Sequence, residues 1–294
     1  MPAAGSDVVT GPSPRLRRAQ ALLGTVVVID VAAPPERAEA ALAAALQRVA
    51  GIHAAMSFHE AGSDLGRIAR ARPGDALQIA ADTHTVLALA LQLEAESGGA
   101  FNACCAAALV ERGLLPAPPD APAAGARTLA EAIELLEGNR LHIRKPAWID
   151  LGGIAKGHAV DAAVAVLQAA GIDSGVVNAG GDLRCFGPEP FTVRVRDPRE
   201  PALSLPLACI TDMACATTAW SLAQPQRRAA HVVGPEGAVA DNPPMSLTVF
   251  APRCALADAL TKVVWLRGRD ATGLLHKHGA NAFVWRENGE QEHL

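Results

Sequence analysis

The sequence contains no tyrosine, and aromatic residues make up only 3% of its 294 residues. A flat ligand bound by this chain would therefore be held by aliphatic side chains, by the backbone and by a few Phe, Trp or His rings. No run of about 18 apolar residues is present, so we expect no transmembrane segment. The formal net charge of -4 gives no reason to expect a basic face, and we therefore expect no nucleic acid as a partner.

Paired thiols of the kind that bind metals are also missing. The six cysteines, at positions 104, 105, 185, 209, 215 and 254, show no C-x-x-C spacing. Because half of the residues are apolar, the chain can bury a core without disulfides, and we expect small buried thiols in a reducing compartment. This pattern favours a cytoplasmic location.

The start of the chain leaves a periplasmic location open as an alternative. Arg15, Arg17 and Arg18 precede a mostly apolar stretch, residues 19–29, and such an arrangement resembles an export signal. Asp30 interrupts that stretch, however, and the β-branched residues 26–29 are typical of a strand. We favour the strand.

The coarse pattern predicts one large domain of the α+β class. We expect a disordered tail over residues 1–18 and a single two-lobed domain over residues 19–294. Residues 116–126, rich in Pro and Ala, are expected to be a loop between the two lobes. Helices are predicted at 36–56, 82–97, 159–170 and 255–266, and strands at 23–33, 148–150, 174–182, 191–196, 205–211, 245–250 and 281–285.

A glycine-rich block is the strongest local signal. In IDLGGIAKGH, residues 149–158, Asp150 ends a predicted strand, the two glycines allow close backbone approach, and Lys156 lies near the start of a helix. A glycine-rich turn, a helix N-terminus and a lysine together favour a phosphate or diphosphate. The alternative is a structural strand–turn–helix with a solvated lysine. The phosphate-loop pattern G-x-x-x-x-G-K-[ST] and the pattern G-x-G-x-x-G are both absent.

The same block resembles the signature of the ApbE-like FAD:protein FMN transferases, in which IDLGGIAKG is followed about twenty residues later by VNAGGD. Four further stretches resemble family motifs and occur in the family's order, so that the resemblance covers residues 20–290. They are Leu23-Gly24-Thr25, MSFHEAGSDLGRI at 56–68, SGGAFNACCAAALV at 97–110 and ALADALTKVV at 255–264.

This resemblance implies both a fold and an activity. The fold would be the family's α+β architecture, with FAD in a cleft between the lobes and one Mg²⁺ on the diphosphate. FMN would be transferred from FAD to a threonine hydroxyl of a partner flavoprotein that carries a Thr motif, and AMP would leave. Two alternatives stay open: a non-catalytic FAD-binding carrier or assembly factor with a degraded metal site, and an FAD pyrophosphatase.

The resemblance also implies roles for individual residues. A threonine hydroxyl is a weak nucleophile and needs a carboxylate to orient or deprotonate it; Asp150 and Asp182 are the candidates. The expected FAD-binding positions are Leu23, His59, Ala100, Phe101, Asn102, Asp150, Lys156 and Val233. The expected metal-binding positions are Gly153, Asp258, Thr261 and Lys262.

The sequence departs from the family pattern at two of these positions. The family usually places Thr four residues after the metal-binding Asp, whereas Lys262 follows Asp258 here and Thr261 stands one residue earlier. The pair is either an exposed i,i+4 ion pair worth about 0.3–0.5 kcal/mol or a site in which the ammonium partly replaces the metal's charge. His59 stands where Tyr or Trp is usual, and it is either a flavin contact or a surface histidine.

Overall fold

An eight-stranded sheet forms the base of the molecule, and all of its neighbouring strands run antiparallel. The computed structural model describes residues 14–197, 199–200, 202–220, 232–234, 237–241 and 243–294. In spatial order the strands are β1 (Arg15–Leu22), β2 (Thr25–Ala32), β6 (Gly175–Ala179), β7 (Asp182–Phe186), β10 (Ala214–Ala219), β11 (Ser246–Ala251), β12 (Asn281–Trp285) and β13 (Gln291–His293).

Three helices form a layer on one face of this sheet, α1 (Pro35–Met56), α6 (Ala155–Ala169) and α7 (Cys254–Arg267). The helices cover this face because the strands present their apolar side chains to it. Along β2, the side chains of Val27, Ile29 and Val31 are fully buried and alternate with half-buried residues, because successive side chains of a strand point to opposite faces. Helix α6 packs between α1 and α7.

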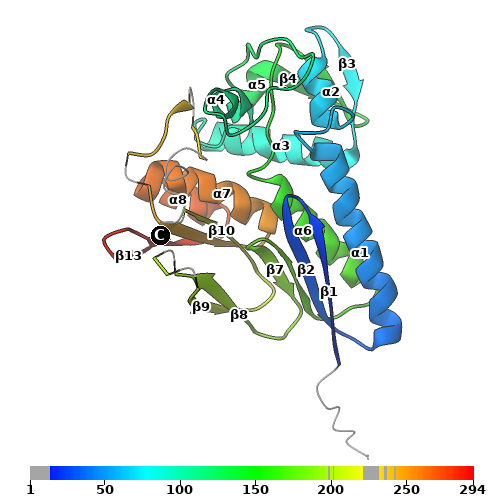
Figure 1. Ribbon diagram of the computed structural model, residues 1–294, viewed down its shortest axis with the longest axis vertical. Coiled ribbons are helices and arrows are strands. Elements are labelled where there is room, and N and C mark those ends of the chain that lie inside the picture. Colours follow the sequence, from blue (N-terminus) through cyan, green and yellow to red (C-terminus); the bar gives the residue numbers. More distant parts are fainter. Residues whose placement is uncertain (1–13, 198, 201, 221–231, 235–236, 242) are drawn as a thin grey trace, which may run out of the picture.

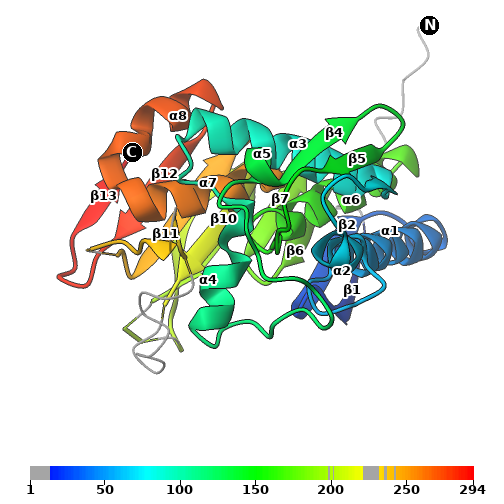
Figure 2. The same cartoon turned by 90° about the horizontal axis from the view of Figure 1, so that it is seen from above.

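The second lobe lies on the far side of these helices from the large sheet (Figures 1 and 2). It contains α2 (Asp64–Arg70), α3 (Ala81–Glu96), α4 (Ala106–Glu111), α5 (Leu129–Ala132) and a small sheet with the order β3 (Ala76–Gln78), β5 (Arg140–Ile143), β4 (Ile133–Leu136). Glu94 of α3 connects that helix to α5, since its carboxylate accepts hydrogen bonds from the backbone N–H groups of Leu129 and Ala130.

Smaller elements complete the chain. A hairpin of β8 (Phe191–Arg196) and β9 (Ser204–Ile210) lies below the large sheet in Figure 1, and α8 (Thr272–Lys277) packs against β12. Two 3-10 turns, Ala103–Cys105 and Gly268–Ala271, precede α4 and α8. Among the described residues, no helix is both long and apolar enough to span a membrane.

Most of the predicted elements are confirmed, and so is the α+β class. The helices predicted at 36–56, 82–97 and 255–266 are α1, α3 and α7. Residues 116–126 form neither helix nor strand, but they join α4 to α5 within the second lobe, so the prediction that they separate the two lobes is wrong. The helix predicted at 159–170 begins earlier, at Ala155, which places Lys156 in its first turn.

Three predictions are corrected. The tail does not extend to residue 18, because residues 15–18 belong to β1 and pair with β2; residues 1–13 lie outside the described residues. The first predicted strand starts at Thr25, since Leu23 and Gly24 form a turn with φ of 57° and 69°. Residues 148–150 are not a strand, because they have no ladder partner and the Asp150 N–H donates instead to the Ala103 carbonyl at 2.9 Å.

Candidate functional site

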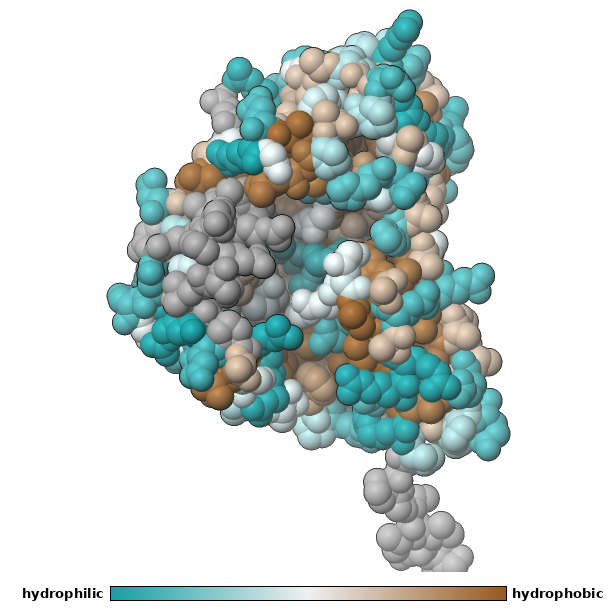
Figure 3. All heavy atoms as spheres, viewed as in Figure 1, coloured by the Kyte–Doolittle hydropathy of each residue, from teal (hydrophilic) through white to brown (hydrophobic). Residues whose placement is uncertain are grey.

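A cleft of about 380 Å³ lies between the second lobe and the N-terminal part of α6. Figure 3 shows this face of the molecule hollowed between its upper and lower parts. Residues of both lobes line the cleft, from the loop before α4 on one side to β10 and α7 on the other. Nine predicted site residues line it: Ala100, Phe101, Asn102, Asp150, Gly153, Lys156, Asp182, Val233 and Lys262.

Asp150 begins the turn that leads into α6. Its Oδ1 accepts a hydrogen bond from the Gly152 N–H at 2.9 Å, and its own N–H is held by Ala103 of the second lobe. Burial raises the pKa of the Asp150 carboxyl, against the opposing effects of the Gly152 N–H and the Lys156 and Lys262 ammonium groups. The turn therefore fixes a carboxylate of increased basicity in the cleft.

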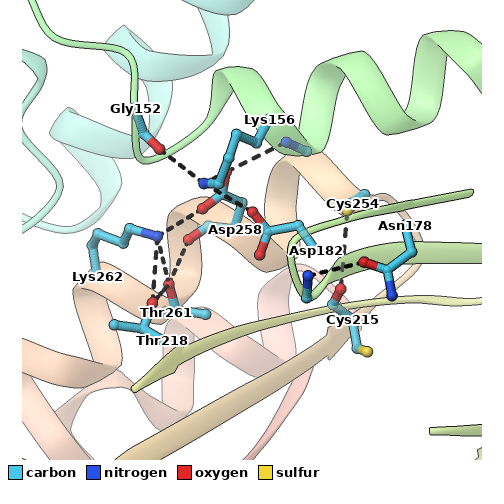
Figure 4. A network of polar contacts seen from close by, with 12 residues as sticks. Gly152, Lys156, Asn178, Asp182, Cys215, Thr218, Cys254, Asp258, Thr261 and Lys262 are labelled. Carbon is cyan, nitrogen blue, oxygen red and sulfur yellow. Dashed lines mark hydrogen bonds and ion pairs between the residues drawn. The ribbon is translucent and has the colours of Figure 1, made fainter. Parts of the chain in front are cut away.

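Lys156 projects from the first turn of α6 toward two carboxylates (Figure 4). Its Nζ lies 2.9 Å from Asp182 Oδ2 and 3.4 Å from Asp258 Oδ2, and it donates to the Gly152 carbonyl at 3.1 Å. Burial alone would lower the pKa of this ammonium, but the charges of Asp258 and Asp182 outweigh burial and hold the pKa above its usual range. Lys156 is thus a charged group of the cleft and not a solvated surface lysine.

Lys262 reaches the same buried carboxylate from α7. Its Nζ lies 2.6 Å from Asp258 Oδ1, 3.0 Å from Thr261 Oγ1 and 3.5 Å from Thr218 Oγ1. The Asp258 side chain is 0% exposed and that of Lys262 only 23%. The interpretation of this i,i+4 pair as an exposed surface pair is therefore wrong.

Asp258 is the centre of the network drawn in Figure 4. One oxygen faces Lys262, and the other faces Lys156 and the Gly157 N–H, which lies at 3.3 Å. Burial opposes ionisation of this carboxyl, but the two ammonium groups hold its pKa below the ordinary value. For Asp182, burial and the charge of Asp258 raise the pKa against the effect of Lys156.

Four predicted residues do not line the cleft, and one of them is Asp258, which is fully buried behind the two lysines. Leu23 lies in the β1–β2 turn, where its N–H is 3.5 Å from His53 Nδ1. His59 packs edge-on against Phe58, with ring centroids 6.0 Å apart, yet it is close enough to Asp150 to lower the pKa of that carboxyl slightly. Thr261 is fully buried beside Asp258 and donates to the Asp258 carbonyl at 2.7 Å.

Sequence reasoning assigned no role to some residues that line the cleft. Thr218 is one of them, and Cys105, Leu109, Thr217, Ala219 and Val232 are the others. The adjacent threonines in the segment ATTAWS, residues 216–221, were the available signal for both of them.

The expected Mg²⁺ would need several oxygen donors at this position. No group of three His, Cys, Asp or Glu side chains that could hold a metal ion occurs within the described residues. Mg²⁺ takes about six oxygens, including one or two carboxylates, but both Asp258 oxygens already face ammonium groups. A Cβ added to Gly153 would lie 3.2 Å from Lys262 Cε, so the lysine side chain also packs against the second expected ligand. These residues do not fit Mg²⁺ on Asp258.

Two proteins of known name are similar to this chain in sequence. The chain is 26% identical over 284 residues to a Rhodobacter capsulatus protein named FAD:protein FMN transferase, with 91% of this chain and 54% of the relative covered. It is 28% identical over 232 residues to a Vibrio cholerae protein of the same name, with 73% and 70% covered. The chain thus spans only about half the length of the R. capsulatus relative.

Solved structures show the same fold. The flavin transferase ApbE of Vibrio cholerae superimposes with a TM-score of 0.81 at 22% identity, covering 96% of this chain and 97% of that one. The ApbE protein of Thermotoga maritima gives 0.79 at 24% identity, covering 95% and 96%. A sequence model of the ApbE family matches residues 23–284, and the chain therefore belongs to the ApbE family.

Proposed function

We propose that this protein is an FAD:protein FMN transferase that binds FAD in the cleft, attaches FMN to a threonine hydroxyl of a partner flavoprotein and releases AMP. The observation that carries the proposal is the pair of ammonium groups, Lys156 and Lys262, on either side of the buried Asp258 carboxylate. They lie in a cleft whose glycine-rich turn permits close approach of a diphosphate. The names of the R. capsulatus and V. cholerae relatives support the same activity.

The reaction breaks the phosphoanhydride bond of FAD and forms a phosphate ester with threonine. The threonine oxygen bonds to the phosphorus on the FMN side of the diphosphate, and the bond from that phosphorus to the bridging oxygen breaks. AMP leaves with the bridging oxygen and its electron pair. Negative charge that builds on the diphosphate is offset by the two ammonium groups, as positive groups do in other phosphoryl transfers.

A carboxylate takes the proton of the threonine. Of the two candidates, Asp150 suits this task better, because Asp182 is 5% exposed and its Oδ2 lies 2.9 Å from Lys156 Nζ. Asp150 lines the cleft, and burial raises its pKa toward the range in which a carboxylate is an efficient base. Since the residues at Asp258 do not fit Mg²⁺, no step is assigned to a metal.

The test is an incubation of the full chain with FAD and a threonine-containing acceptor domain, with and without added Mg²⁺. In-gel flavin fluorescence, an acceptor mass increase of one FMN, and AMP in the supernatant are measured. An acceptor whose threonine is changed to alanine is the control, and it should stay unlabelled. Release of FMN and AMP without labelled acceptor would instead indicate a pyrophosphatase, and tight FAD binding without turnover would indicate a carrier.

A further inference from the structure

The side chain of Lys262 fills the space between two positions that were expected to bind a metal. Its stem packs against Gly153, where an added Cβ would lie 3.2 Å from Lys262 Cε and 3.5 Å from Cγ. Its Nζ then lies 2.6 Å from Asp258 Oδ1. A cation bound jointly by the Gly153 backbone and the Asp258 carboxylate would have to displace this side chain.

The oxygen atoms around this ammonium are oriented to accept its protons. The Thr261 hydroxyl donates its own proton to the Asp258 carbonyl at 2.7 Å, and the Thr218 hydroxyl donates to Thr261 Oγ1 at 2.9 Å. Both hydroxyl protons are therefore used elsewhere, and the lone pairs of both oxygens face Lys262 Nζ at 3.0 and 3.5 Å. A lysine ammonium has three donors, and it finds three oxygens here.

The charges at this point favour the lysine over an added metal ion. Asp258 is fully buried, and its ionised form is stabilised by Lys156 and Lys262 together. A divalent ion at the same carboxylate would lie within a few ångströms of both ammonium groups, and such like charges repel more strongly in a buried site than in water. Both oxygens of the Asp258 carboxylate already face an ammonium group, and Lys156 also pairs with Asp182.

We propose that the Lys262 ammonium takes the place of a divalent cation at Asp258, so that this chain binds the FAD diphosphate and transfers FMN without a metal at that position. The inference rests on the proposed function for the transfer step, whereas its statement about the Asp258 site stands independently. Lys262 lines the cleft, so its charge, held beside Asp258, would offset the charge of a diphosphate bound there.

The experiment uses the full chain after treatment with EDTA and dialysis. Binding of Mn²⁺ is followed by electron paramagnetic resonance, FAD affinity by calorimetry in EDTA and in Mg²⁺, and FMN transfer in the same two buffers. The variant is Lys262→Thr, which removes the ammonium and adds an oxygen. The matched control is Lys277→Thr, the same change at an exposed lysine whose Nζ lies 2.9 Å from Glu96 Oε1, away from the cleft.

The wild-type chain and the Lys277→Thr variant are expected to bind no Mn²⁺ at Asp258 and to show the same FAD affinity and the same transfer rate in both buffers. Lys262→Thr should bind Mn²⁺ and lose transfer in EDTA by about 100-fold or more, as when one preorganised charge-stabilising donor is removed. Mg²⁺ should restore much of that loss.

Wild-type protein that binds Mn²⁺ stoichiometrically and needs Mg²⁺ for FAD binding and transfer would overturn the inference and leave the proposed function standing. Absence of acceptor labelling in every buffer would overturn the proposed function, and the Mn²⁺ and FAD titrations of the wild-type chain would still decide the inference. Those titrations also decide it if Lys262→Thr does not fold.

Discussion

The contact between α6 and α7 at Gly157 gives the sharpest test of the described packing. A Cβ at this position would lie 2.3 Å from the Cys254 carbonyl oxygen and 2.7 Å from Ala255 Cα. Non-bonded carbon atoms prefer separations of about 3.5 Å or more, and these neighbours are backbone atoms that cannot rotate away. Gly157→Ala would therefore force the two helices apart by about 1 Å, and overpacking of this kind typically costs about 1–3 kcal/mol.

This loss of stability should be accompanied by weaker FAD binding in the cleft. The Gly157 N–H lies 3.3 Å from Asp258 Oδ2, so a shift of α6 also moves Lys156 away from that carboxylate. At roughly 2–4 °C per kcal/mol for a domain of this size class, the melting temperature should fall by roughly 2–12 °C, and FAD affinity measured by calorimetry should fall with it.

A helical glycine elsewhere supplies the matched control. Gly51 lies in α1, and nothing stands within 4 Å of the Cβ that alanine would add there. Gly51→Ala should therefore raise stability by about 0.5–1 kcal/mol, the usual gain of alanine over glycine in a helix. If Gly157→Ala melts at or above the temperature of the wild-type protein, the close approach of α6 and α7 is refuted.

Three further predictions concern the cleft. Asp150→Asn should lower the FMN transfer rate by roughly 10²–10⁴, the usual contribution of a positioned base, with an unchanged circular dichroism spectrum; full activity would show that Asp150 only shapes the turn. FAD should bind more tightly than FMN in calorimetry, because two ammonium groups suit a diphosphate, and equal affinities would remove that argument. Burial raises the pKa of Asp150 above its ordinary value of 3.8, and a general base must be deprotonated to act. The transfer rate should therefore fall as the pH is lowered, with an apparent pKa above 3.8. A rate that stays level down to that pH would exclude Asp150 as the base.

The elements that could be predicted were those whose apolar residues recur at a regular spacing or in a long run. Helix α1 buries Leu42, Val49 and Ile52 along one stripe, and α7 is apolar over most of its length, so both were visible in the sequence. Strand β1 was not, because its residues are mostly exposed and show no alternation of apolar and polar side chains. Its strand conformation comes from backbone pairing with β2, which a local pattern does not reveal.

The candidate site was predictable in its residues but not in its arrangement. The glycine-rich block identified Asp150 and Lys156, and both line the cleft. The spacing of Asp258 and Lys262 fits equally well an exposed pair or a buried one, and only the packing of α7 against β10 decides between them. That packing also brings Thr218 to Thr261, two residues that are far apart in the sequence.

The two ends of the large sheet have a consequence for how this protein behaves at high concentration. An edge strand exposes N–H and C=O groups that can pair with another molecule, and charged or very short edge strands prevent such pairing. One edge is β1, whose arginines Arg15, Arg17 and Arg18 are all exposed; the other is β13, only three residues long and polar throughout. Charged side chains at one edge and shortness at the other therefore protect an open sheet from growing into aggregates by addition of further copies.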